Sequence, residues 1–129
     1  ANDIDKKALK SIETRSNREN ITNIVTIVGE VEKPLFPEGV MDMVVMVYVL
    51  HDLEKPVELL KNIKPSMKPD APLVILERDP EKTSDTSGHF YKKEKLLSLV
   101  SGAGYELVRT EAFLPRDNIY IFQAKTPSQ

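Results

Sequence analysis

Residues 39–79 read GVMDMVVMVYVLHDLEKPVELLKNIKPSMKPDAPLVILERD. The segment from Val40 to Leu50 is almost entirely apolar and rich in β-branched valine, which favours an extended backbone. An apolar run without alternation is typical of a strand that is covered on both faces, as in a parallel sheet. His51-Asp52, a helix that begins at Pro56 and a second apolar run at Leu73 to Leu76 follow. This order predicts a βαβ unit, which binds ligands beyond the carboxyl ends of its strands.

The length, net charge and residue content of the chain exclude several classes of protein. The chain has 129 residues, a formal net charge of −2 and no cysteine. This length fits one domain, residues 1–129, and the mixed charges argue against nucleic-acid binding. No apolar segment reaches the roughly 18 residues that a membrane-spanning helix needs. With His51 and His89 as the only histidines, a histidine-based metal cluster is not expected. We therefore expect a soluble, cytoplasmic protein without a metal site or a membrane partner.

The residues before this unit continue the alternation of strands and helices. Residues 1–4 resemble the end of a strand, and Asp5 is a candidate N-cap for a helix that ends near residues 17–20. A strand is expected over Ile21 to Val28, closed by Gly29. The prolines of residues 30–38 predict a loop.

The residues after it complete the sheet. Pro65 is expected to end the preceding helix early, and the polar segment Pro80 to Gly88 predicts a flexible binding loop. A helix is expected over Lys92 to Ala103. Strands are expected at Tyr105 to Phe113 and Asn118 to Ala124, and they must be antiparallel because the turn between them is short.

In this order the elements resemble a class I S-adenosylmethionine-dependent methyltransferase of the small-molecule type. The resemblance implies an α/β, Rossmann-like sheet that is mostly parallel with an antiparallel C-terminal strand pair. The matching pieces are Asp3-Ile4-Asp5, Gly29-Glu30-Val31, Met41-Asp42-Met43-Val44-Val45, Val49-Leu50-His51-Asp52-Leu53, Leu73-Val74-Ile75 and Ala103-Gly104-Tyr105. A different Rossmann-like nucleotide binder is the alternative, and the antiparallel final pair favours the methyltransferase variant.

The chain departs from the family pattern in two places. The glycine-rich loop that follows the family's first strand has no counterpart, so the chain resembles the C-terminal two-thirds of the domain, without the first strand and first helix. The turn Lys68-Pro69-Asp70-Ala71 stands where the family usually has two glycines after the proline. Because alanine rarely adopts positive φ, this turn is expected to differ in shape.

The resemblance implies S-adenosylmethionine as the cofactor and assigns its adenosine end to two strand ends. Asp3 would accept hydrogen bonds from the ribose hydroxyls, and Ile4 would pack on the adenine. Glu30 would accept a hydrogen bond from the adenine amino group, while the backbone N–H of Val31 meets a ring nitrogen. The alternatives are an acid favoured by the helix dipole for Asp3 and an ordinary solvated loop acid for Glu30.

The predicted core strand supplies the remaining candidates. Met46 and Val47 would contact the cofactor through backbone and apolar surface, although core packing explains them as well. His51 is expected to line the pocket rather than act as a general base, because methyl transfer from a sulfonium depends mostly on alignment of donor and acceptor. His89 either faces the acceptor or is simply exposed. No catalytic residue is assigned.

Two functions follow from this reading. In the first, the chain takes part in S-adenosylmethionine-dependent methyl transfer to a small-molecule acceptor that the sequence does not identify. In the second, it is a non-catalytic α/β module that associates with itself or a partner. Without the family's first strand, the predicted core strand has an unpaired apolar edge. We expect this edge to pair with a second copy, which gives a homo-oligomer, or with a displaced strand of the same chain.

Overall fold

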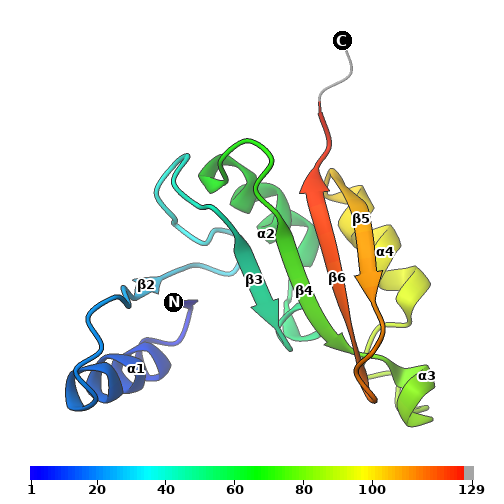
Figure 1. Ribbon diagram of the computed structural model, residues 1–129, viewed down its shortest axis with the longest axis horizontal. Coiled ribbons are helices and arrows are strands. Elements are labelled where there is room, and N and C mark those ends of the chain that lie inside the picture. The colour runs from blue at the N-terminus through cyan, green and yellow to red at the C-terminus, as the bar shows by residue number, and fades with distance from the viewer. Residues whose placement is uncertain (127–129) are drawn as a thin grey trace.

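The structure, a computed structural model, describes residues 1–126 and begins with a small N-terminal unit. This unit consists of β1 (Asn2–Asp3), α1 (Lys6–Arg18) and β2 (Ile27–Val28), and β1 pairs with β2 in parallel. Figure 1 shows it beside the main sheet, with α1 at the far end from β3. The predicted strand end at residues 1–4 and the predicted helix are both confirmed.

The local sequence explains where α1 begins and why β2 is short. The side chain of Asp5 accepts a hydrogen bond from the backbone N–H of Lys7 at 2.8 Å, which is the predicted N-cap. The prediction of a strand over Ile21 to Val28 was wrong in its extent, since only Ile27–Val28 is extended and paired. Apolar residues alone do not make a strand when its only neighbour, β1, offers two residues for pairing.

The main sheet has four strands in the order β3-β4-β6-β5. Their bounds are Val44–Val47 for β3, Leu73–Arg78 for β4, Tyr105–Glu111 for β5 and Asp117–Ala124 for β6. β3 and β4 are parallel, whereas β6 lies between β4 and β5 and is antiparallel to both. The predicted α/β, Rossmann-like class with an antiparallel C-terminal strand pair is therefore confirmed.

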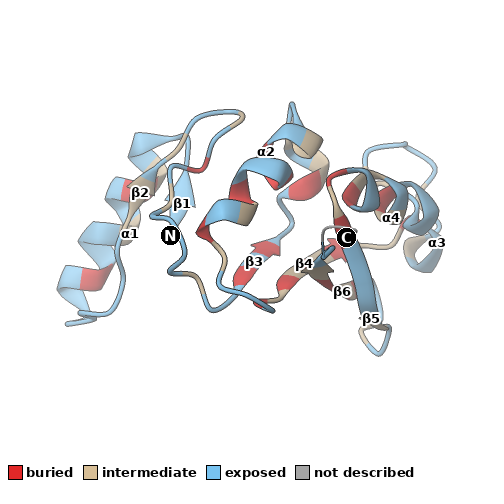
Figure 2. Cartoon of the chain, turned by 90° about the horizontal axis from the view of Figure 1, so that it is seen from above, coloured by how far each residue is buried: buried red, intermediate tan, exposed pale blue. Residues whose placement is uncertain are grey.

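Two helices, α2 (Pro56–Ile63) and α4 (Lys93–Gly102), cover one face of this sheet, as Figure 2 shows from above. The core between the sheet and these helices contains Val44, Met46, Leu59, Leu60, Ile63, Leu73, Ile75, Leu96, Val100, Tyr105, Tyr120 and Phe122. The predicted coverage of the core strand on both faces was wrong. On β3, the alternate residues Val45 and Val47 are 55% and 50% exposed, because no helix among the described residues packs on that face.

β3 is also shorter than predicted and lies at the edge of its sheet. The segment Val40 to Leu50 contributes four strand residues, and its end turns into a 3₁₀ helix, η1 (Leu50–Asp52). The turn depends on Tyr48, whose backbone N–H still donates to the carbonyl of Leu76 at 3.0 Å while its φ of 55° takes the chain out of the strand. In the part of the chain that is described, only β4 pairs with β3.

Prolines and one aspartate explain the remaining turns. Pro56 lies in the first turn of α2, and α2 ends at Ile63, just before Pro65, as predicted, with a 3₁₀ helix, η2 (Lys64–Ser66), following it. In the turn after it, Asp70 adopts the positive φ, at 63°, so that Ala71 does not need a positive φ. No helix within residues 1–126 is long and apolar enough to cross a membrane.

The prediction of a loop over the whole polar segment Pro80 to Gly88 was wrong. It begins with a short helix, α3 (Pro80–Thr83), whose N-cap Asp79 accepts a hydrogen bond from the backbone N–H of Glu81 at 2.9 Å. The combination of an acidic N-cap and proline at the first helical position explains this helix. Residues 84–88 form the loop that follows.

Candidate functional site

A cavity of about 530 Å³ lies between the N-terminal unit and the edge formed by β3 and α2. Five of the residues predicted to contact a cofactor line it: Asp3, Ile4, Glu30, Val31 and Met46. They come from the carboxyl ends of β1 and β2 and from β3, three strands whose ends the fold brings to one place. Val47 and His51 do not line this cavity, and their predicted contacts with a cofactor stay predictions.

The carboxylate of Asp3 is fixed by its own turn. Its Oδ1 accepts from the backbone N–H of Asp5 at 2.9 Å, and its backbone carbonyl accepts from the N–H of Gly29 at 2.9 Å. The first contact orients the carboxylate, and the second ties the end of β1 to the end of β2. Among the hydrogen bonds of the described residues, none uses Oδ2 of Asp3, so this oxygen is available to a ligand hydroxyl.

Gly29 is required where β2 turns towards the cavity. A Cβ on this residue would lie 3.0 Å from Nδ2 of Asn2 and 3.2 Å from the carbonyl oxygens of Lys33 and Pro34. Asn2 holds the same turn by donating from Nδ2 to the carbonyls of Ile27 and Pro34, both at 2.9 Å. The glycine therefore lets the backbone fold tightly enough to present Glu30 and Val31 at the cavity.

The loop after Gly29 is attached to α2 across the cavity. Glu32 forms an ion pair with Lys55, and its backbone carbonyl accepts from Nδ2 of Asn62 at 2.8 Å. The hydrogen bond from Lys55 lowers the pKa of the Glu32 carboxyl. These two contacts connect the loop after β2 to α2 beside the cavity.

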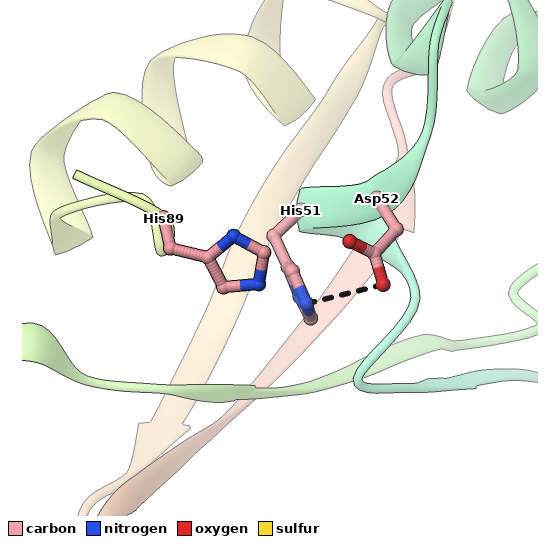
Figure 3. Close-up of side chains that lie close together, drawn as sticks. All are labelled: His51, Asp52 and His89. Atoms are coloured by element: carbon pink, nitrogen blue, oxygen red, sulfur yellow. Dashed lines mark ion pairs between the residues drawn. The ribbon is translucent and has the colours of Figure 1, made fainter. Parts of the chain in front are cut away.

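A second group of functional side chains lies at the carboxyl ends of β3 and β4. Nδ1 of His51 lies 2.8 Å from Oε2 and 3.1 Å from Oε1 of Glu77, and Nε2 lies 3.3 Å from Oδ2 of Asp52. The side chains of His51 and Glu77 are only 6% and 3% exposed. His89 approaches from the loop after α3, and its ring centroid lies 5.0 Å from that of His51. Figure 3 shows the side chains of His51, Asp52 and His89 close together.

Sequence reasoning had missed Glu77 as a partner of His51, although a signal was present. Side chains alternate along a strand, so Leu73 and Ile75 on the buried face of β4 are followed there by Glu77. An acid at a position that the period assigns to the core needs a partner, because an unpaired buried charge is unfavourable. The backbone N–H of His51 also lies 3.3 Å from Oε1 of Glu77, which places the start of η1 against β4.

The comparisons with known proteins agree with this architecture. The structure of a SAM-dependent methyltransferase from Aquifex aeolicus matches with a TM-score of 0.82 and 20% identity, over 93% of this chain and 65% of that one. A SAM-dependent methyltransferase structure from Methanosarcina mazei matches with a TM-score of 0.75 and 15% identity, over 95% and 80% of the two chains. At these low identities the TM-scores show a shared fold, and the chain spans 65% of the length of the Aquifex protein.

A third solved structure contains ligands. It is the 1,6-didemethyltoxoflavin-N1-methyltransferase of Burkholderia thailandensis with bound 1,6-didemethyltoxoflavin and S-adenosylhomocysteine, which matches with a TM-score of 0.67 and 14% identity, over 89% of this chain and 56% of that one.

Sequence comparison identifies the family directly. No curated protein matches the chain. The family model described as a methyltransferase domain matches residues 1–75, which include β1, α1, β2, β3 and α2. The chain therefore belongs to the methyltransferase domain family, as its sequence pattern had predicted.

Proposed function

We propose that this chain binds the adenosine end of S-adenosylmethionine in the cavity beside β3 and contributes to methyl transfer to a small-molecule acceptor. The observation that carries the proposal is the meeting of two carboxylates and two exposed apolar side chains at one cavity. Asp3 and Glu30 line it together with Ile4 and Val31, which are 59% and 38% exposed. Exposed apolar residues beside hydrogen-bond acceptors are what a flat, polar-edged adenine ring needs.

Each residue has a separate part in this proposal. Asp3 accepts from the ribose hydroxyls through the oxygen that its own turn leaves available. Glu30 accepts from the adenine amino group, and Ile4 and Val31 contact the ring faces. Family membership and the cofactor product bound to the Burkholderia structure support the choice of S-adenosylmethionine over other nucleotides. The 1,6-didemethyltoxoflavin bound in that structure also supports a small-molecule acceptor.

Calorimetric titration with S-adenosylmethionine and S-adenosylhomocysteine tests this proposal. We expect saturable binding, which Asp3→Asn and Glu30→Gln each weaken by roughly 10- to 100-fold, because each removes a charged hydrogen-bond acceptor. Asparagine retains an oxygen for the N–H of Asp5, so the turn at Asp3 survives. Glu38→Gln, in the same loop but away from the cavity, is the matched control. Equal affinities for all four proteins would overturn the assignment.

The second candidate function is self-association of a catalytically silent module. It is supported by the edge of β3, where Met43, Val45 and Val47 are exposed and where no strand of residues 1–126 pairs. Such an edge is a template for pairing with a second copy. Absent or only millimolar binding of S-adenosylmethionine favours this module, and sedimentation that shows a compact monomer at micromolar concentration argues against pairing between copies. The cytoplasmic location stays a prediction.

A further inference from the structure

We propose that His51, Asp52 and His89 form a binding site for a divalent transition metal of the zinc type, with Glu77 as the residue that orients His51. The sequence alone had argued against such a site, because it contains only two histidines, His51 and His89. The fold brings them together. One ligand atom from each of the three side chains lies within 4.8 Å of the others. Figure 3 shows the three side chains side by side.

Glu77 determines which nitrogen of His51 can bind a metal. An ionised carboxylate accepts hydrogen bonds and donates none, so Nδ1 of His51, 2.8 Å from Oε2 of Glu77, carries the proton. Nε2 is then left with its lone pair. A histidine that donates one ring N–H to a carboxylate and offers the other nitrogen is the usual arrangement of metal-ligating histidines. Burial of both side chains keeps this orientation in place.

The contact between His51 and Asp52 needs a positive charge between its two atoms, which a proton or a metal ion can supply. Nε2 of His51 and Oδ2 of Asp52 lie 3.3 Å apart, and both are acceptors when Nδ1 holds the proton. Two acceptors at this distance repel each other unless a positive charge lies between them. Two ligands bound tetrahedrally at about 2.1 Å from zinc lie about 3.4 Å apart, so the observed pair already has the spacing of a metal chelate.

His89 is the reason to infer a metal ion rather than a proton. A proton shared between Nε2 of His51 and Oδ2 of Asp52 would need only these two atoms. His89, from a different segment of the chain, places a third possible metal ligand beside them. His89 is exposed on the loop after α3, and one of its ring nitrogens lies within 4.8 Å of the ligand atoms of His51 and Asp52. The edge-on contacts of Phe90 with both imidazole rings, with centroids 4.7 Å apart in each case, hold the two rings near each other.

Charge and coordination number agree with this inference. Asp52 and Glu77 together supply two negative charges, which match a divalent cation. Three protein ligands leave a fourth tetrahedral position open, as in zinc sites that bind water or a small molecule. Asp52 also lines the cavity described above, so the open position lies beside it. The class of ligand that would complete the site is a small molecule with an oxygen or sulfur donor.

Zinc titration of the purified full-length protein, after chelator treatment and in the absence of S-adenosylmethionine, tests the site. We expect one zinc ion per chain, and at least a tenfold loss of affinity in His89→Ala and in Asp52→Asn. Both residues are exposed, so these variants should keep the wild-type melting temperature in metal-free buffer. Glu54→Gln, a neighbouring acid that lines the cavity but lies outside the cluster, is the control and should bind zinc normally.

Glu77→Gln tests the orienting role separately. Loss of a carboxylate behind a metal-bound histidine lowers affinity by roughly 10- to 100-fold. The imidazole ¹⁵N resonances of His51 should show zinc on Nε2 in the wild type, which a merely structural role of Glu77 would not predict. Failure to bind one zinc ion per chain, or equal zinc affinities of wild type and His89→Ala, would overturn the proposal. Because zinc is measured without cofactor, such a failure leaves the proposed adenosine site untouched.

Discussion

The N-terminal unit and the main sheet contrast sharply in how they are stabilised. In β1, α1 and β2, Leu9 is the only buried apolar residue, whereas the main sheet buries a continuous core against α2 and α4. Two strands of two residues each add little stability of their own. The N-terminal unit therefore depends on hydrogen bonds and ion pairs at its edges, and the main sheet on burial of apolar surface.

The candidate functional residues are distributed over both of these regions. The proposed adenosine contacts Asp3 and Glu30 belong to the weakly packed unit, and the cluster around His51 lies at the carboxyl ends of β3 and β4 in the main sheet. Segments with few buried contacts open at low free energy, so ligand binding to Asp3 and Glu30 should order the N-terminal unit more than the main sheet. The following predictions test how far the two regions are independent.

The largest expected effect is on the core of the main sheet. Leu60 is fully buried, so Leu60→Ala should lower the free energy of unfolding by about 2–5 kcal/mol, measured by urea denaturation. Leu9→Ala in α1 is the matched substitution in the other region. Hydrogen exchange should accelerate over residues 6–28 in Leu9→Ala, with little change in β4 and β6. Equal loss of protection in both regions would show that they unfold as one unit.

A smaller effect is expected at the turn that leads to the cavity. Gly29→Ala introduces a Cβ against two carbonyl oxygens, and we expect a cost of about 1–3 kcal/mol that is confined to the N-terminal unit and its binding of S-adenosylmethionine. Gly102→Ala in α4 is the control, since nothing lies within 4 Å of the added Cβ and alanine is the better helix former. Weaker binding in the control would contradict this explanation.

In the main sheet, Tyr105→Phe should lower the free energy of unfolding by about 1 kcal/mol. Its hydroxyl donates to the backbone carbonyl of Leu60 at 2.7 Å, so Tyr105→Phe leaves this acceptor without its partner. Burial raises the pKa of Tyr105, so the folded state keeps a proton that the unfolded chain releases above about pH 10. Stability should therefore fall with rising pH above that value, less steeply in Tyr105→Phe. Urea denaturation at both sides of pH 10 measures this, and identical slopes would contradict it.

The smallest effect on folding is expected at the open edge of β3. Val45→Lys places a charge on an exposed position, so the free energy of unfolding should change by no more than about 0.5 kcal/mol. Self-association should nevertheless decrease, because a charge on an edge strand opposes pairing between chains. Val108→Lys on β5, the opposite edge of the sheet, is the control for analytical ultracentrifugation. A decrease only in this control would assign the interface to β5.

Much of the fold could be predicted because its signals are local. The N-cap at Asp5, the start of α2 at Pro56 and its end before Pro65 follow from the chemistry of single residues. The extents of the strands were less predictable. A strand needs a hydrogen-bonding partner, and the valine-rich segment contains four paired residues because β4 is its only neighbour in the described part of the chain.

By itself, the sequence determined the α/β class, the order of the elements and the presence of Asp3 and Glu30 at two strand ends, because these depend on residue type and spacing along the chain. Only the tertiary structure decided that β6 lies between β4 and β5, that one face of β3 is open, and that Glu77 and His89 meet His51. These contacts join residues far apart in sequence. Strand pairing in the main sheet and the turn of the chain into η1 bring them together, and the local sequence does not specify these partners.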